Sequence, residues 1–214
     1  AMIPHRVLVM VGSGPAAPDH LDLVVRRGVS PALAGDLWEW LGRTCDWDLI
    51  DLDGLRENGL LAGLLLRRSE DHRAAETTAC PYLRLPPTWE EFELSLGKNH
   101  RQSIRRYRRK LEREAPAPVT SRLVTAPGEI AATVDRLGEL HQQIRTAHGD
   151  RGAFATAELA EFHRRVAIRF GEAGRLRLRR LDVGTEMIAG ILCYRFGDTV
   201  AFYTTGYDHR WSRY

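Results

Sequence analysis

The sequence is poor in cysteine and in long apolar runs. Its three cysteines, Cys45, Cys80 and Cys193, are odd in number and widely spaced along 214 residues, which argues against a disulfide framework and against a Cys-x-x-Cys metal site. The longest apolar run, Leu60 to Leu66, contains a glycine and is far shorter than the roughly 20 residues that span a bilayer. No charged-then-apolar leader opens the chain. We therefore expect a cytoplasmic protein with no membrane span.

Positive charge is concentrated in one segment. The formal net charge is +3, yet residues 98–113 hold eight basic residues against one acid, Glu112, so the rest of the chain is net acidic. An anionic partner is therefore expected to bind locally. Only two of the 31 basic residues are lysine, an arginine excess that a GC-rich genome also produces. Apolar residues make up 43% and charged residues 28% of the chain, values typical of a globular protein with a core.

The first part of the chain predicts short helices and strands in alternation. Ser30 and Pro31 provide an N-cap with proline at the first helical position, and Thr88 with Glu91 forms a capping box. Apolar patterning predicts strands at 6–11 (buried), 21–25, 47–52 and 78–85, and helices at 31–43, 55–68 and 89–96.

The second part has a clearer pattern. It predicts a strand at 119–125, helices at 128–147 and 157–171, and strands at 175–183, 186–196 and 199–206. Short turns join the last three strands, which favours antiparallel hairpins. Because the last two strands are apolar on both faces, helices should cover both sides of the sheet. The expected fold class is therefore α+β, with a mixed sheet between two helical layers.

A basic helix is predicted between these two parts, at 99–114. Ile104, Tyr107 and Leu111 recur at helical spacing and should form its buried stripe. Arg101, Arg105 and Arg108 flank that stripe by the same spacing. Such a flank can line a cleft and hold phosphate or carboxylate through the guanidinium fork. Docking of the whole helix on nucleic acid is the rival interpretation.

Histidine on the apolar face of a helix has two interpretations. His141 lies within the stripe of the helix predicted at 128–147, and the core stripe of the next helix runs through Leu159, Phe162, Val166 and Phe170. A histidine in such a stripe is ordinarily a hydrogen-bonded residue of the core or its rim. A general base tuned by its surroundings is the alternative.

Several sequence segments, taken together, point to a family. They are Trp89-Glu-Glu-Phe, Ser95-Leu-Gly-Lys-Asn99 with Arg101, Arg105 and Leu111-Glu112, Leu140-His141 with Arg145, Gly152-Ala-Phe154, Gly174 to Leu178, Ile188-Ala-Gly190 and Tyr203 to Trp211. Their order over roughly 81–214 resembles the Fem-like acyltransferases of GNAT fold. The likeness is greatest to the bacterial group of acetyltransferases involved in cellulose biosynthesis. Residues 6–85 resemble the back half of the first lobe of such two-lobe enzymes more weakly.

The resemblance implies a division of the chain into two partial lobes. Residues 1–96 correspond to the back half of the first GNAT-like lobe, and 97–214 to the linking basic helix and the front half of the second. The chain stops where relatives continue into a pyrophosphate loop and its helix. We therefore expect a fragment of a two-lobe enzyme. By itself, this fragment should bind CoA weakly or not at all and should have little or no activity. A permuted single domain is the alternative.

The resemblance also implies an activity and its site. In GNAT folds the acyl-CoA thioester lies along a splayed strand, here 199–206, whose backbone polarises the carbonyl while an amine or hydroxyl attacks. The implied co-substrate is acetyl-CoA or another acyl-CoA, with no metal. The implied acceptor is a small molecule or glycan of the cell envelope or a polysaccharide. Fem-like members use aminoacyl-tRNA instead, the one nucleic-acid partner expected here.

On this basis we assign site residues in three groups. The catalytic candidates are His141 and Asp208. The substrate-binding candidates are Lys98, Asn99, Arg101, Arg105, Arg145, Tyr203 and Tyr207, and the cofactor-binding candidates are Thr204, Thr205 and Gly206. There is a structural alternative for two of these residues: Asp208 only caps the end of the strand, and Tyr203 only packs against its neighbours. Two other functions stay open, a nucleic-acid-binding module that uses helix 98–113 and a silent scaffold lobe. The sequence leaves the oligomeric state undetermined.

Overall fold

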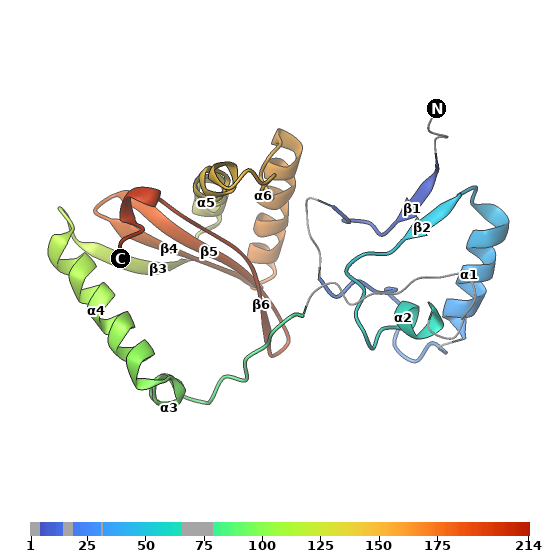
Figure 1. Ribbon diagram of the computed structural model, residues 1–214, viewed down its shortest axis with the longest axis horizontal. Coiled ribbons are helices and arrows are strands. Elements are labelled where there is room, and N and C mark those ends of the chain that lie inside the picture. The colour runs from blue at the N-terminus through green and yellow to red at the C-terminus, as the bar shows by residue number, and fades with distance from the viewer. Residues whose placement is uncertain (1–4, 15–18, 31, 66–78) are drawn as a thin grey trace. The chain divides into compact units, whose positions relative to one another are not determined.

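The computed structural model describes residues 5–14, 19–30, 32–65 and 79–214, and the chain forms two compact units, Ala1–Leu83 and Arg84–Tyr214 (Figure 1). The sequence placed the boundary at 96/97 instead. Helix α3 (Trp89–Ser95) belongs to the second unit because Arg101 and Arg105 of α4 (Lys98–Glu114) bind it directly. The assignment of the units to two GNAT-like lobes stays a prediction.

The first unit contains a small parallel β-pair. Strand β1 (Val7–Val9) pairs with β2 (Leu49–Asp51), and α1 (Leu33–Thr44) connects them. The predicted burial of the first strand is wrong, since Val7 and Val9 are half exposed. A sheet of two three-residue strands has too little surface to bury both faces. Helix α1 confirms the predicted helix, but its start is corrected: the helix begins at Leu33 with Ala32 as its N-cap residue, and the Ser30 hydroxyl accepts the Ala32 amide at 3.2 Å instead of capping the helix. Pro31 lies outside the described residues.

Two further expectations for this unit are corrected. The strand expected at 21–25 is a single bridge between Leu21 and Leu55. The helix expected at 55–68 begins later, as α2 (Leu60–Leu65), because the Asp22 carboxylate accepts hydrogen bonds from the amides of Leu60 and Leu61 at 2.8 and 3.0 Å and so caps the helix there. Residues 66–68 lie outside the described part.

The strand expected at 78–85 is also absent from residues 79–85, while residue 78 lies outside the described part. Tyr82 and Leu85 are 84% and 69% exposed. Pro81 and Pro86 each lack the amide hydrogen that a ladder requires. The next prediction is confirmed, because the Thr88 hydroxyl accepts a hydrogen bond from the Glu91 amide at 3.2 Å at the start of α3.

The second unit is built on a four-stranded antiparallel sheet in the order β3-β4-β5-β6. Its strands are β3 (Val119–Val124), β4 (Leu176–Val183), β5 (Glu186–Phe196) and β6 (Thr199–Tyr207). Helices α5 (Pro127–Ala147) and α6 (Ala157–Glu172) connect β3 to β4, and the 3₁₀ helix η1 (His209–Trp211) follows β6. The three final strands are sequential antiparallel neighbours, as predicted, and the α+β fold class is confirmed. The expected mixed character of the sheet is wrong for these four strands, because β3 also pairs antiparallel with β4.

Helices lie on both faces of this sheet, as Figure 1 shows. Helices α5 and α6 cover one face, where Val134, Leu137, Leu178 and Leu192 are fully buried. Helix α4 lies over the other face, where buried Leu111 packs in one cluster with residues of β4 and β5. The sheet therefore presents two different surfaces, one closed by a full core and one covered by a single helix.

Candidate functional site

Strand β6 is an edge strand with a bulge in its middle. Its register with β5 shifts at one point, so that Leu192 pairs with Thr204 and Cys193 with Phe202, leaving Tyr203 as an extra residue. A bulge of this kind interrupts the ladder and re-aims the side chains beside it. Here Tyr203 and Thr204, although adjacent in sequence, both reach toward the α5–α6 layer, where each lies near a histidine.

The backbone of β6 alternates between β5 and the open edge. The Asp208 amide donates to the Ile188 carbonyl of β5 at 2.8 Å. By the two-residue alternation of a strand, Gly206 and Thr204 also face β5. The amides of Thr205 and Tyr207 therefore point away from β5, at the outer edge of the sheet as ordered in the described residues.

His141 of α5 joins that edge to the loop before α6. Its Nδ1 lies 2.9 Å from the Thr205 carbonyl oxygen, to which it donates, and 3.0 Å from the Thr204 hydroxyl. A carbonyl can only accept, so Nδ1 carries the proton and Nε2 accepts the Ala153 amide at 3.4 Å. His141 is 7% exposed and both ring nitrogens are engaged. The side chain is thus arranged to position β6, with neither nitrogen left for a substrate proton.

A second histidine, His163 of α6, completes this arrangement. Its Nε2 donates to the Ala153 carbonyl at 3.0 Å and lies 3.3 Å from the Tyr203 hydroxyl. Burial lowers the pKa of His163, and nearby His141 lowers it further, so the ring is neutral near pH 7. Burial likewise raises the pKa of Tyr203 to about 12. The bulge of β6 is therefore held by two buried imidazoles, of which His163 is neutral near pH 7.

The core stripe predicted for α6 is confirmed at Phe170, which packs against the core, but is wrong by one residue at Phe162. Phe162 is half exposed, whereas His163 and Ala167 are almost completely buried. The small Ala167 lets the helix approach the core closely, and His163 finds its hydrogen-bond partners there. The polar character of His163 hid this face in the sequence. Its spacing of four from Ala167 was the available signal.

Two arginines predicted to bind substrate hold α3 in the structure, and their role toward a substrate stays a prediction. One terminal nitrogen of Arg101 donates to the carbonyls of Glu93, Leu94 and Leu96 at 3.3, 2.8 and 2.7 Å. Arg105 forms an ion pair with the Glu93 carboxylate at 2.8 Å. The C-terminus of a helix has unsatisfied carbonyls and partial negative charge, which a guanidinium complements. The neighbouring candidates Lys98 and Asn99 are exposed at the start of α4.

Three other candidates, Arg145, Asp208 and Gly206, also contact residues within the chain. Arg145 pairs with Asp150 at 3.4 Å. Asp208 accepts the Arg210 amide at 2.9 Å as the cap of η1, and hydrogen bonds from the Arg210 side chain lower the pKa of Asp208, which makes it a weak base. At Gly206, a Cβ would lie 2.6 Å from the His141 amide nitrogen. Gly206 is therefore where α5 approaches β6 most closely.

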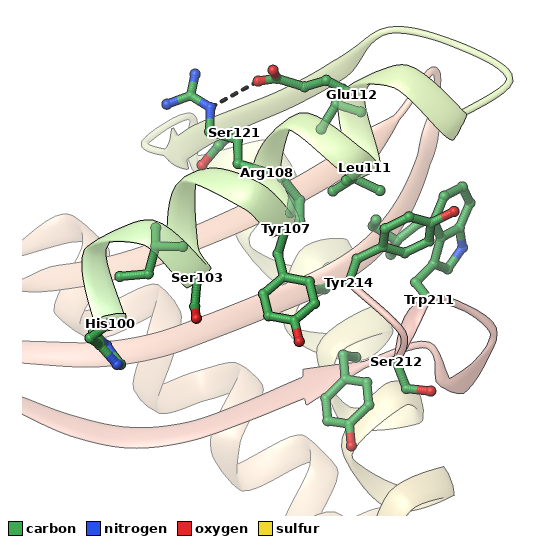
Figure 2. Close-up of a pocket in the computed structure, with 16 residues that line it drawn as sticks. His100, Ser103, Tyr107, Arg108, Leu111, Glu112, Ser121, Trp211, Ser212 and Tyr214 are labelled. Atoms are coloured by element: carbon green, nitrogen blue, oxygen red, sulfur yellow. Dashed lines mark hydrogen bonds and ion pairs between the residues drawn. The ribbon is translucent and has the colours of Figure 1, made fainter. Parts of the chain in front are cut away.

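A cavity of about 820 Å³ separates α4 from the open face of the sheet. In Figure 2, His100, Ser103, Tyr107 and Leu111 reach into it from α4, opposite the strands. The predicted burial of the α4 stripe is confirmed at Leu111 but wrong at Ile104 and Tyr107, which are 47% and 40% exposed. The C-terminal half of α4 packs on the sheet through Leu111, and the stripe before it faces the cavity.

A family model for an acetyltransferase (GNAT) domain matches residues 98–214. No curated protein and no solved structure matches the chain. Within the described ranges, no helix is long and apolar enough to cross a membrane, and the same residues contain no group of three or more His, Cys, Asp or Glu side chains arranged to hold a metal.

Proposed function

The chain belongs to the acetyltransferase (GNAT) domain family, and from this we propose that it transfers an acetyl group from acetyl-CoA to an amine or hydroxyl at the outer edge of β6. The proposed acceptor is a small molecule or glycan of the cell envelope or a polysaccharide, as the Fem-like and cellulose-associated subgroup would use. A cytoplasmic location is part of the proposal, because the free thiols of Cys45, Cys80 and Cys193 suit a reducing compartment.

The observation that carries the proposal is the orientation of the Thr205 and Tyr207 amides. Acetyl-CoA supplies an acyl carbonyl activated as a thioester. An amide that points out of a strand edge can donate to the carbonyl oxygen and stabilise the negative charge that develops there during attack. The bulge at Tyr203 interrupts the ladder just before these amides, and β6 has no further strand beside it among the described residues.

The two histidines contribute by fixing the strand. His141 binds the Thr205 carbonyl directly, and His163 binds the loop that His141 also contacts. Both imidazoles are buried, so water does not compete strongly for these hydrogen bonds. A donor that does not reorient during the reaction stabilises the transition state without a reorganisation penalty. In this proposal His141 and His163 are positioning residues, whereas the sequence suggested His141 as the base.

The test replaces one donor and keeps the strand. Proline at Thr205 removes the outward amide hydrogen, and proline is tolerated where the amide faces away from the ladder. Thr205→Ala is the matched control, since it removes the hydroxyl that donates to the Gly190 carbonyl but retains the amide. Calorimetric titration with acetyl-CoA should show at least tenfold weaker binding for Thr205→Pro than for Thr205→Ala.

Folding is checked by circular dichroism, and Tyr207→Pro repeats the test if the first variant does not fold. Thiol release from acetyl-CoA in the presence of simple amines measures transfer itself. Unchanged affinity in a folded proline variant would remove the role of the β6 amides. The proposal replaces the sequence-based expectation of weak or no CoA binding, so absence of acetyl-CoA binding by the unmodified chain would reject the proposed donor.

Docking of α4 on nucleic acid stays a prediction from charge. Within the chain Arg101, Arg105, Arg108 and Arg113 already donate to carbonyls or carboxylates. Half of the eight basic residues are thus engaged, which weakens that alternative.

A further inference from the structure

The cavity between α4 and the sheet has no role in the acyl transfer proposed above. Its volume of about 820 Å³ lies within the roughly 300–1,000 Å³ of typical small-molecule sites. Aliphatic side chains from one helix and three strands form its floor. They are Leu111, Val119, Leu181, Ile188 and Ala189.

Large apolar groups around the cavity remain in contact with water. Ile104, Tyr107 and Tyr207 line it and are 47%, 40% and 39% exposed. Trp211 and Tyr214 form the opposite wall in Figure 2, across from the ring of Tyr107. Removing these groups from water is favourable, so an apolar ligand in the cavity would gain affinity from all of them.

Polar groups are present at the cavity as well, and four hydroxyls among them have no hydrogen-bond partner in the described part of the chain. The hydroxyls of Ser103, Tyr107, Tyr207 and Ser212 line it and make no hydrogen bond to another residue in the part of the chain that the structure describes. Each hydroxyl can donate one hydrogen bond. A ligand with an acceptor head group would satisfy several of these donors.

Basic side chains contact the aromatic rings that line the cavity. Arg106 lies 4.8 Å from the ring centre of Tyr107, while Lys110 and Arg213 lie 5.2 and 4.9 Å from that of Tyr214. Arg108 lines the cavity and pairs with Glu112, and Glu114 accepts the Tyr214 hydroxyl at 3.0 Å. Arg108 and Glu112 both line the cavity and neutralise each other, so the charge that favours an anion comes from the three cations against the lining rings of Tyr107 and Tyr214.

We propose that this cavity binds a fatty carboxylate, a single alkyl chain with an anionic head. The chain lies over the aliphatic floor, and the carboxylate meets the hydroxyls and cations at the rim. The site is on the face of the sheet opposite α5 and α6 and does not use the β6 amides. The proposal of a fatty-carboxylate site can therefore be tested independently of the proposed acetyl transfer.

The first experiment titrates the whole chain with octanoate, decanoate and dodecanoate below their micelle concentrations and follows binding by calorimetry. Burial of a methylene is worth about fourfold in affinity, so each step of two carbons should tighten binding roughly fifteenfold until the floor is covered. Decanoate should bind at least tenfold more tightly than decyltrimethylammonium at low salt, and added salt should narrow the difference. Affinity that is independent of chain length or of head-group charge would overturn the proposal.

The second experiment uses matched variants. Ile104→Asp places a carboxylate in the cavity from a half-exposed helical position and should weaken decanoate binding at least tenfold. Phe162→Asp is the control, because Phe162 is equally exposed on α6, over the opposite face. Arg108→Gln and Arg165→Gln form a second matched pair, since each arginine is exposed and pairs with a glutamate one helical turn away. Equal losses within either pair would contradict the assignment.

The variants also separate this site from the alternatives. Thr205→Pro should lose acetyl-CoA affinity and keep decanoate affinity, and Ile104→Asp should do the reverse. Sedimentation of the unmodified chain tests a second copy as the occupant. If the chain self-associates, and if Ile104→Asp abolishes this association while Phe162→Asp does not, a second copy of the chain occupies the cavity. That result would overturn the proposal.

Discussion

Substitution of Gly206 by alanine should weaken the contact between α5 and β6. A Cβ built at this position would lie 2.6 Å from the His141 amide nitrogen, 2.8 Å from the Leu137 carbonyl oxygen and 3.1 Å from the Leu140 carbonyl carbon. All three atoms belong to the backbone of α5, so no side chain can rotate away. Relief therefore requires the helix to move away from the strand.

The expected magnitude follows from the displacement. Ordinary contacts begin near 3.4 Å, so α5 must retreat by somewhat less than 1 Å, and overpacking of this kind costs about 1–3 kcal/mol. The same movement stretches the His141 hydrogen bond to Thr205, which contributes about 1 kcal/mol. Alanine regains about 0.5–1 kcal/mol over glycine from backbone entropy. The net destabilisation is about 1–3.5 kcal/mol, with a midpoint near 2 kcal/mol, or on the order of 40-fold in the unfolding equilibrium.

Native-state hydrogen exchange of the β4 and β5 amides is the suitable assay, because it reports on the second unit separately from the first. Gly190→Ala is one control, since its Cβ would meet the flexible end of Met187 and should cost less. Gly128→Ala is the other, because nothing lies near its Cβ and alanine there should stabilise α5 slightly. Overpacking costs at least about 1 kcal/mol. If Gly206→Ala lowered the free energy of unfolding of the second unit by less than about 1 kcal/mol, the close-approach argument would be refuted.

Two further predictions concern pH and the α3–α4 contact. Because burial lowers the pKa of His163 below its usual 6.5, the unfolded state binds this proton first, and stability should fall as pH drops below about 6.5, by up to about 1.4 kcal/mol per pH unit. Urea titrations from pH 7.5 to 5 should show a shallower decline for His163→Phe, and an unchanged slope would contradict the assignment. Arg101→Ala should cost α3 on the order of tenfold in exchange protection, since three carbonyls lose a charged donor. Arg105→Ala should change the exchange protection of α3 little, because the ion pair of Arg105 is exposed. If Arg101→Ala lowered the protection no more than Arg105→Ala does, Arg101 would not be the residue that holds α3.

Local signals predicted most elements of the second unit. The capping box at Thr88 and Glu91 places the start of α3, and short turns specify the hairpins β4–β5 and β5–β6. These features depend on neighbouring residues alone, so they can be read from sequence. The basic helix and the α5 stripe through Val134 and Leu137 follow from periodicity in the same way.

The errors arose where a partner far along the chain decides the outcome. Residues 79–85 have strand-like composition but pair with no strand in the described part of the chain. Ile104 has the spacing of a core residue, yet α4 packs on the sheet near Leu111 and leaves Ile104 at a cavity. For the same reason, the site candidates could be named from motifs but not assigned to partners.

The sequence by itself determined the α+β class, the order of elements after residue 119 and the positive charge of α4, because each depends on short-range pattern or composition. Only the tertiary structure decided that Arg101 and Arg105 bind α3, that both ring nitrogens of His141 form hydrogen bonds with backbone groups, and that a cavity lies under α4. Those outcomes require contacts between residues distant in sequence, and side-chain periodicity carries no information about which distant groups will meet.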